Sequence, residues 1–145
     1  MSLDEIINKL NSITPEVIDE GLLKVVKQNQ IEAVDMNTSQ LFSGRDSQGQ
    51  PLGFYRNEKY AVFKNYLNPS PGFGVMDWKL TGSLYVQWYV HADRFPITFG
   101  SSDEKFETLN QLNEEAKGLD QTNLEQFRQE IKPQVQDLFR SLLQL

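Results

Sequence analysis

The chain has 145 residues, which fits one domain spanning 1–145, and its 20 acidic and 14 basic residues give a formal net charge of -6. This balance argues against a surface built to neutralise nucleic-acid phosphates, although an acidic wall would let DNA slide past without sticking. The absence of cysteine excludes disulfide bonds and thiolate metal sites, and no apolar run approaches the roughly 20 residues that span a bilayer.

Residues 1–43 are expected to form a helical N-terminal arm. Apolar residues at helical spacing predict an amphipathic helix over 3–12, and Thr14-Pro15 has the form of an N-cap followed by proline at the first helical position. From 15 to 43, either one long helix with a poorly packed middle or two helices end to end fits the pattern. The first residues carry acids where a secretion signal has bases, so we expect a protein made and kept in a cytoplasm, with no membrane partner.

Residues 44–74 read as loop, helix and loop. Three glycines and a proline place a loop over 44–53, and Asp46 with Gly49 fits a tight turn better than a calcium loop, which needs more oxygen ligands. A short helix is predicted over 57–67, with Tyr60, Phe63 and Leu67 on its apolar face. The proline- and glycine-rich segment 68–74 then ends that helix.

Residues 75–100 are expected to form the β-hairpin around which the chain is organised. From Leu84 the residues alternate, with Leu84, Val86, Trp88 and Val90 on one parity and Tyr85, Gln87, Tyr89 and His91 on the other. Alternation resumes at Ile97 and Phe99 after a break at 92–94, which predicts two antiparallel strands. Thr81-Gly82 would allow a sharp turn just before the first strand.

Residues 101–145 are predicted to form the C-terminal helices. A helix follows Ser101 to Glu104 and stops near Gly118, and Thr122 with Glu125 has the capping-box form that opens the last helix. Pro133 should kink that helix or divide it in two. The predicted class is α+β: mainly helical, with a central antiparallel β-hairpin or small sheet at about 84–100 packed by the N- and C-terminal helices.

The sequence offers little for catalysis. His91 is the single histidine, its neighbours do not form a nucleophile elbow, and phosphate-binding glycine loops are absent. We therefore expect no catalytic residue, no cofactor and no metal site, and a protein that is not an enzyme. Aromatic residues suggest contacts instead: Trp88 fits core packing, while Trp78, Tyr85 and Tyr89 fit a protein–protein contact better than stacking on bases, because basic residues are sparse around them.

Several short motifs occur in a fixed order, each of them visible in the sequence. They are Gly44-Arg45-Asp46-Ser47-Gln48-Gly49, Tyr60-Ala61-Val62-Phe63-Lys64, Asp77-Trp78-Lys79-Leu80-Thr81-Gly82-Ser83-Leu84-Tyr85, Ser101-Ser102-Asp103-Glu104-Lys105 and Glu125 to Pro133. Together, over roughly residues 40 to 135, they resemble small phage and prophage structural proteins of Bacteroidetes-type bacteria. The Thr81-Gly82-Ser83-Leu84 element is also similar to a segment of tail-completion and head–tail joining proteins. In the Asp77–Tyr85 motif, Trp78 stands where the phage and prophage proteins have leucine, and the 68–74 linker is longer than the resemblance leads us to expect.

This resemblance implies a virion component of the neck or tail junction, working as a homo-oligomeric ring around the DNA channel. Its partners would be portal, neck or tail proteins, with packaged DNA passing nearby. The residues expected to make these contacts are Asp77, Trp78, Lys79, Leu80, Thr81, Gly82, Tyr85 and Tyr89. A tail terminator or minor capsid protein is the second possibility, and a host-side nucleic-acid-binding or regulatory module is the alternative from another class.

Overall fold

Residues 2–144 are described by a computed structural model, and in this range the chain forms seven α-helices, one 3-10 helix and a two-stranded sheet. In chain order the elements are α1 (Leu3–Ser12), α2 (Pro15–Gln28), α3 (Gln30–Phe42), α4 (Glu58–Leu67), α5 (Ser83–Val86), β1 (Trp88–His91), β2 (Thr98–Ser101), α6 (Phe106–Leu112), η1 (Glu114–Ala116) and α7 (Gln121–Leu143). The predicted class, mainly helical α+β with a central antiparallel hairpin, is confirmed. Within residues 2–144 no helix combines the length and the apolarity needed to cross a membrane.

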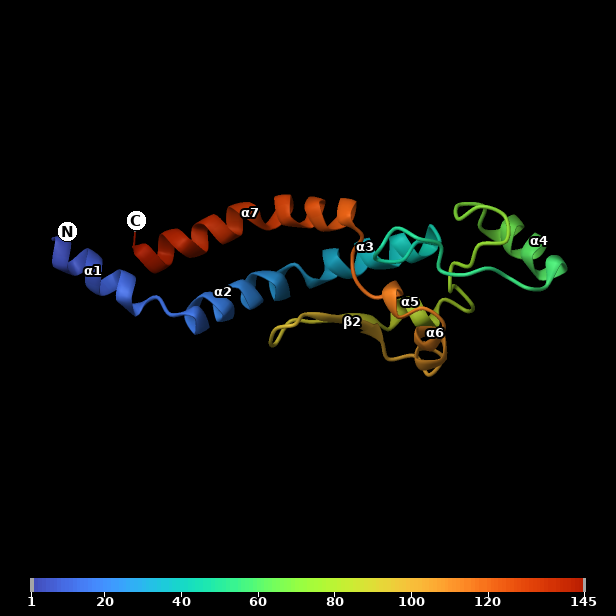
Figure 1. Cartoon of the computed structure of the whole chain (residues 1–145), viewed down its shortest axis with the longest axis horizontal. Coiled ribbons are helices and arrows are strands. Elements are labelled where there is room, and N and C mark those ends of the chain that lie inside the picture. The colour runs from blue at the N-terminus through green and yellow to red at the C-terminus, as the bar shows by residue number, and fades with distance from the viewer. Residues whose placement is uncertain (1, 145) are drawn as a thin grey trace.

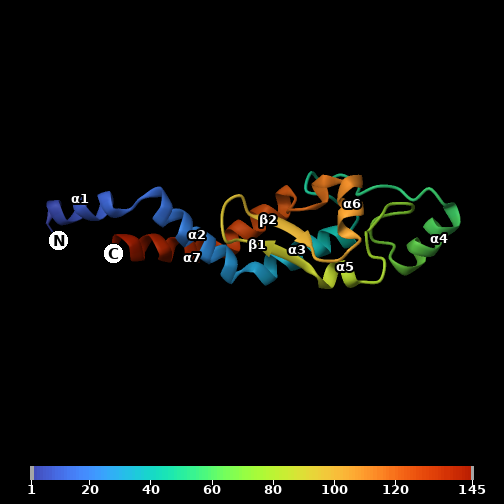
Figure 2. The same cartoon turned by 90° about the horizontal axis from the view of Figure 1, so that it is seen from below.

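A helical arm makes up one end of the elongated molecule. Here α7 runs back along α2 and α1, so that both chain ends lie at the same end of the molecule (Figures 1 and 2). Helix α2 begins as predicted, because Pro15 is its first residue and the Thr14 hydroxyl accepts a hydrogen bond from the Val17 N–H at 3.3 Å. Gly21 lets α2 and α7 approach closely, since a Cβ at this position would lie 2.7 Å from the Leu138 side chain.

Of the two possibilities left open for residues 15–43, two helices end to end is the one that forms. The break falls at Asn29, whose amide nitrogen donates to the Val25 carbonyl at 2.7 Å and to the Gln134 side chain at 2.8 Å. Asn29 interrupts the apolar stripe, and its hydrogen bonds hold the junction between α2 and α3 against α7.

The start of α7 corrects the capping prediction. Asp120, rather than Thr122, is the N-cap, and its carboxylate accepts from the Asn123 N–H at 2.9 Å. The reason is tertiary: the Asp120 N–H donates to the buried Gln40 side chain at 2.7 Å, which fixes the backbone there in an extended conformation. Pro133 does not divide the helix, which runs continuously to Leu143 and bends along its length (Figure 1).

The hairpin is shorter than the alternation predicts. Strand β1 pairs with β2 from Trp88 opposite Ser101 to His91 opposite Thr98, whereas Leu84 and Val86 belong to the helical turn α5. The turn forms because Gly82 adopts a left-handed φ of 89° and because the Ser101 hydroxyl donates to the Leu84 carbonyl at 2.8 Å, where a longer β2 would have paired. Val86 consequently lies 86% exposed instead of in the core.

The hydrophobic core lies between α3 and the hairpin and contains two fully buried amide side chains. Asn37 accepts hydrogen bonds from the Trp88 indole N–H at 3.1 Å and from the Gly118 N–H at 2.9 Å, and its own amide donates to the Ala116 carbonyl. The α3 helix therefore holds the segment between η1 and α7 by specific polar contacts as well as by apolar packing. The predicted stop near Gly118 falls in this segment, after α6 and η1, where Gly118 has a φ of 102°.

Candidate functional site

The eight residues expected to contact partners are split by the structure. Asp77 and Trp78 are each 2% exposed, Gly82, Tyr85 and Tyr89 are half-buried, and Lys79, Leu80 and Thr81 are exposed. In this conformation the first two side chains cannot reach a partner. Of the remaining six, Lys79 to Gly82 form the segment that leads into α5, Tyr85 lies in α5 and Tyr89 lies in β1.

Asp77 forms a buried ion pair with Lys64, and this pair, with its contacts to Asn68 and Lys79, is called the clamp below. The Asp77 carboxylate lies 2.9 Å from the Lys64 ammonium and accepts hydrogen bonds from the Asn68 amide at 3.0 Å and the Lys79 N–H at 2.8 Å. Lys64 in turn donates to the Lys79 carbonyl at 2.6 Å. Because both ions are buried and each is held by more than one polar contact, this group ties α4 to the segment before the hairpin.

Two tyrosines stand beside this clamp. The Tyr85 hydroxyl donates to the Asp77 carbonyl oxygen, and the Tyr55 hydroxyl lies 3.5 Å from the Asp77 carboxylate. Burial, and next the negative charge of Asp77, raise the pKa of both phenols well above the ordinary value near 10. Both groups therefore stay protonated at neutral pH and act as hydrogen-bond donors rather than as general bases.

Trp78 belongs to the core, where it joins Leu41, Leu52, Leu84 and Trp88. The physical reason is its backbone, which has a φ of 57° and so turns the indole ring inward at a position outside any strand. A contact surface made of Trp78 together with Tyr85 and Tyr89 is therefore not present in this conformation. Tyr89 instead stacks on His91, with ring centroids 4.1 Å apart.

The Asp46 turn is occupied by the protein's own donors. One carboxylate oxygen accepts from the Gln48 and Gln50 N–H groups, both at 2.9 Å, and the other accepts from the Asn113 amide at 3.1 Å. These bonds make the Gly44–Gly49 motif a tight turn fastened to the residues before η1. Across residues 2–144, no three His, Asp or Glu side chains gather in a group that could hold a metal ion.

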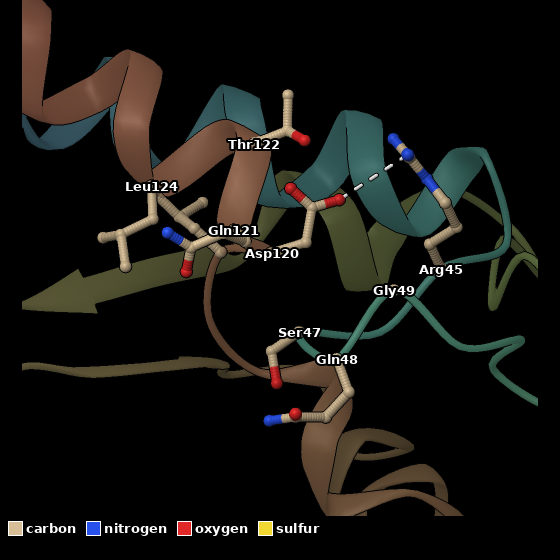
Figure 3. A pocket seen from close by; sticks show the side chains of 9 residues that line it. Arg45, Ser47, Gln48, Gly49, Asp120, Gln121, Thr122 and Leu124 are labelled. Carbon is tan, nitrogen blue, oxygen red and sulfur yellow. Dashed lines mark ion pairs between the residues drawn. The ribbon is translucent and has the colours of Figure 1, made fainter.

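A hollow of about 500 Å³ lies between this turn and the start of α7 (Figure 3). Arg45 reaches across it to within 3.6 Å of the Asp120 carboxylate, whose other oxygen caps α7. The two charged side chains that face the hollow thus neutralise each other. The arrangement joins the turn to the helix, and the Ser47 hydroxyl at the same hollow donates to the Glu115 carboxylate at 3.2 Å.

Helix α4 presents its apolar side to solvent, which is opposite to the prediction. Tyr60, Phe63 and Leu67, predicted as the apolar face of this helix, are exposed, while the inward side carries Ala61 and the clamped Lys64. The inward side is held by the polar contacts of the clamp, so the apolar side chains are left to face water. Sequence reasoning missed this surface because helical spacing identifies a common face but not which way it points.

The outward surface of α4 comprises Lys59, Val62, Phe63, Tyr66 and Leu67, and these residues are called the α4 face below. Tyr66 is 85% exposed, and the helix lies at the end of the molecule opposite the arm (Figures 1 and 2). Contiguous apolar surface of this kind marks an interaction site in soluble proteins.

No protein-family model, no curated protein and no solved structure matches the chain. Its function is therefore inferred from its own residues and their arrangement.

Proposed function

We propose that the chain is a non-catalytic structural subunit of a phage virion. It works in the neck or at the top of the tail, where it assembles by subunit–subunit contacts into a ring around the DNA channel and contacts portal, neck or tail proteins.

The observation that carries this proposal is the α4 face. An aromatic side chain covers about 150–250 Å², so Phe63 and Tyr66, with their exposed fractions of 53% and 85%, offer on the order of 280 Å² to solvent. Val62 and Leu67, 55% and 58% exposed, add to this, and the total is comparable to the largest apolar patch of a typical monomer, which is often functional. A protein that works by being bound needs such a surface.

Two of the motifs in the phage resemblance supply the two ions of one pair. Lys64 comes from the Tyr60–Lys64 motif and Asp77 begins the Asp77–Tyr85 motif, and their side chains meet at 2.9 Å. The clamp fixes α4 so that its apolar residues point outward. These motifs therefore have a structural role that suits an assembly subunit, since they present a contact surface.

The charge of the chain supports a place beside DNA without tight binding. With 20 acidic against 14 basic residues, the chain does not favour the release of phosphate counterions that drives nucleic-acid binding. A channel wall of this kind lets DNA pass.

The test is the mass and shape of the purified chain, measured by light scattering and negative-stain electron microscopy, alone and with any portal or tail proteins that are encoded beside its gene. We expect closed oligomers and no salt-sensitive affinity for DNA. A monodisperse monomer that binds none of those proteins contradicts the proposal. DNA binding that weakens steeply with salt would instead identify a nucleic-acid-binding module.

A further inference from the structure

A second apolar surface lies at the opposite end of the molecule from the α4 face. It consists of Leu3, Ile6, Ile7 and Leu10, which share one side of α1 and are called the α1 stripe below. These side chains remain 41–71% exposed although α1 runs beside α7. Figures 1 and 2 show α1 and α4 at the two ends of the long axis, so one molecule cannot bring the two surfaces together.

We propose that the α1 stripe of one copy of this chain packs on the α4 face of the next copy. This head-to-tail contact rests on the proposed function, because it supplies the interface between neighbouring subunits of the ring.

The two helices match in length. Each has 10 residues, which corresponds to about 15 Å of helix, so the stripe can lie along the whole of α4. Both helices are capped by side chains, through the Ser2–Glu5 capping box on α1 and through Asn57 on α4. The two surfaces are therefore preformed, and little ordering is needed for them to pack.

The charges beside the two surfaces are complementary. On α1 the acids Asp4 and Glu5 outnumber the single base Lys9. At and just before α4 the bases Arg56 and Lys59 outnumber Glu58, even with Lys64 left out because its charge is neutralised in the clamp.

This complementarity favours the α1 stripe, rather than a second α4 helix, as the partner of the α4 face. If two α4 faces met across a two-fold axis, the interface would hold the excess of bases from both copies, with no acids from α1 to offset it. An α1 stripe instead brings acids to these bases. The contact joins two different surfaces, so it repeats from copy to copy and closes into a ring when the rotation between neighbours allows.

The lack of cysteine in this chain provides a clean test by cross-linking. One variant carries Tyr66→Cys on α4, and two others carry Leu3→Cys or Leu10→Cys at the two ends of the α1 stripe. Each is treated with a short bis-maleimide, alone and in pairwise mixtures. Arg94→Cys, at the exposed hairpin tip, is the control.

We expect cross-linked dimers when Tyr66→Cys is mixed with at least one of the α1 variants, and none from any single variant or from a mixture with Arg94→Cys. Dimers from Tyr66→Cys alone would show that α4 meets α4 and would overturn the inference. Oligomers without an α1–α4 cross-link would overturn it too, yet leave the ring proposal standing. Cross-links in a chain that forms open filaments and binds no neck protein would support this contact and refute the ring.

A charge-reversal pair tests the same contact without cysteine. Lys59→Glu changes an exposed side chain and is expected to weaken self-association by about fivefold, as for loss of a surface ion pair. Adding Asp4→Lys to the same chain should restore most of the affinity, and Asp4 is chosen because Glu5 is needed for the α1 cap. Failure of the double variant to recover, with circular dichroism showing intact helices, would contradict the α1–α4 pairing.

Discussion

Replacing Asp77 with asparagine removes one ion of the buried clamp while keeping the shape of the side chain. The Lys64 ammonium is then left in a site where its side chain is only 9% exposed, and the new amide group faces the Asn68 and Lys79 donors. Breaking a buried ion pair from one side costs about 3–5 kcal/mol. Since the free energy of unfolding of a whole domain is about 5–15 kcal/mol, Asp77→Asn is expected to remove a large part of it.

The assay is urea unfolding followed by tryptophan fluorescence. Trp78 follows Asp77 directly and lies in the same core cluster as Trp88, the second of the two tryptophans, so the signal reports the region that the substitution disturbs. With a slope of about 2 kcal/mol per molar urea, the midpoint should fall by roughly 2 M.

A matched control exists in the exposed pair of Lys27 and Asp93, which has the same N–O distance of 2.9 Å but side chains 60% and 76% exposed. Asp93→Asn is expected to cost less than about 1 kcal/mol. If Asp77→Asn shifts the midpoint no more than Asp93→Asn does, burial does not determine the strength of the clamp and the reasoning fails.

Three further substitutions test the clamp, the turn and the buried amide. Because the pKa values of Tyr55 and Tyr85 are raised in the folded state, their contribution to stability is complete below about pH 10 and is lost as the pH rises above it, where the unfolded phenols ionise. Urea midpoints between about pH 8 and pH 11 should fall, and less steeply in Tyr85→Phe; equal slopes would contradict the assignment. Gly44→Ala is expected to cost about 2–4 kcal/mol, measured by the same unfolding assay, because φ is 73° and the new Cβ would lie 2.6 Å from the Pro71 ring. Asn37→Ala, which leaves the Trp88 and Gly118 N–H groups buried without their acceptor, should lower the stability by about 2–4 kcal/mol, and a loss below about 1 kcal/mol would show that water replaces the amide.

Local signals in the sequence located most helices. Thr14-Pro15 marks the start of α2 because capping and the fixed φ of proline act within a few residues, and the spacing in α1 and α4 needs no distant partner to be recognised. The turn at Gly44 to Gly49 follows from glycine and aspartate chemistry in the same way. The strand predicted from Leu84 failed because strands are stabilised by a partner, and β2 ends opposite Trp88.

The sequence did not predict the burial of two of the expected contact residues. Asp77 and Trp78 belong to a motif that is visible in the sequence. The burial of Asp77 depends on Lys64 and Asn68, which precede it by 13 and 9 residues, and the burial of Trp78 depends on its left-handed backbone. The α4 face was not predicted at all, since Tyr60, Phe63 and Leu67 were assigned to the inward side.

The sequence by itself determined the helices, the tight turn, the mainly helical α+β class and the acidic charge, because each depends on neighbours in the chain or on composition. Only the tertiary structure decided which side of α4 faces water. Periodicity defines a face but carries no direction, and the direction is set by an ion pair between Lys64 and Asp77, whose attraction depends on their meeting in space.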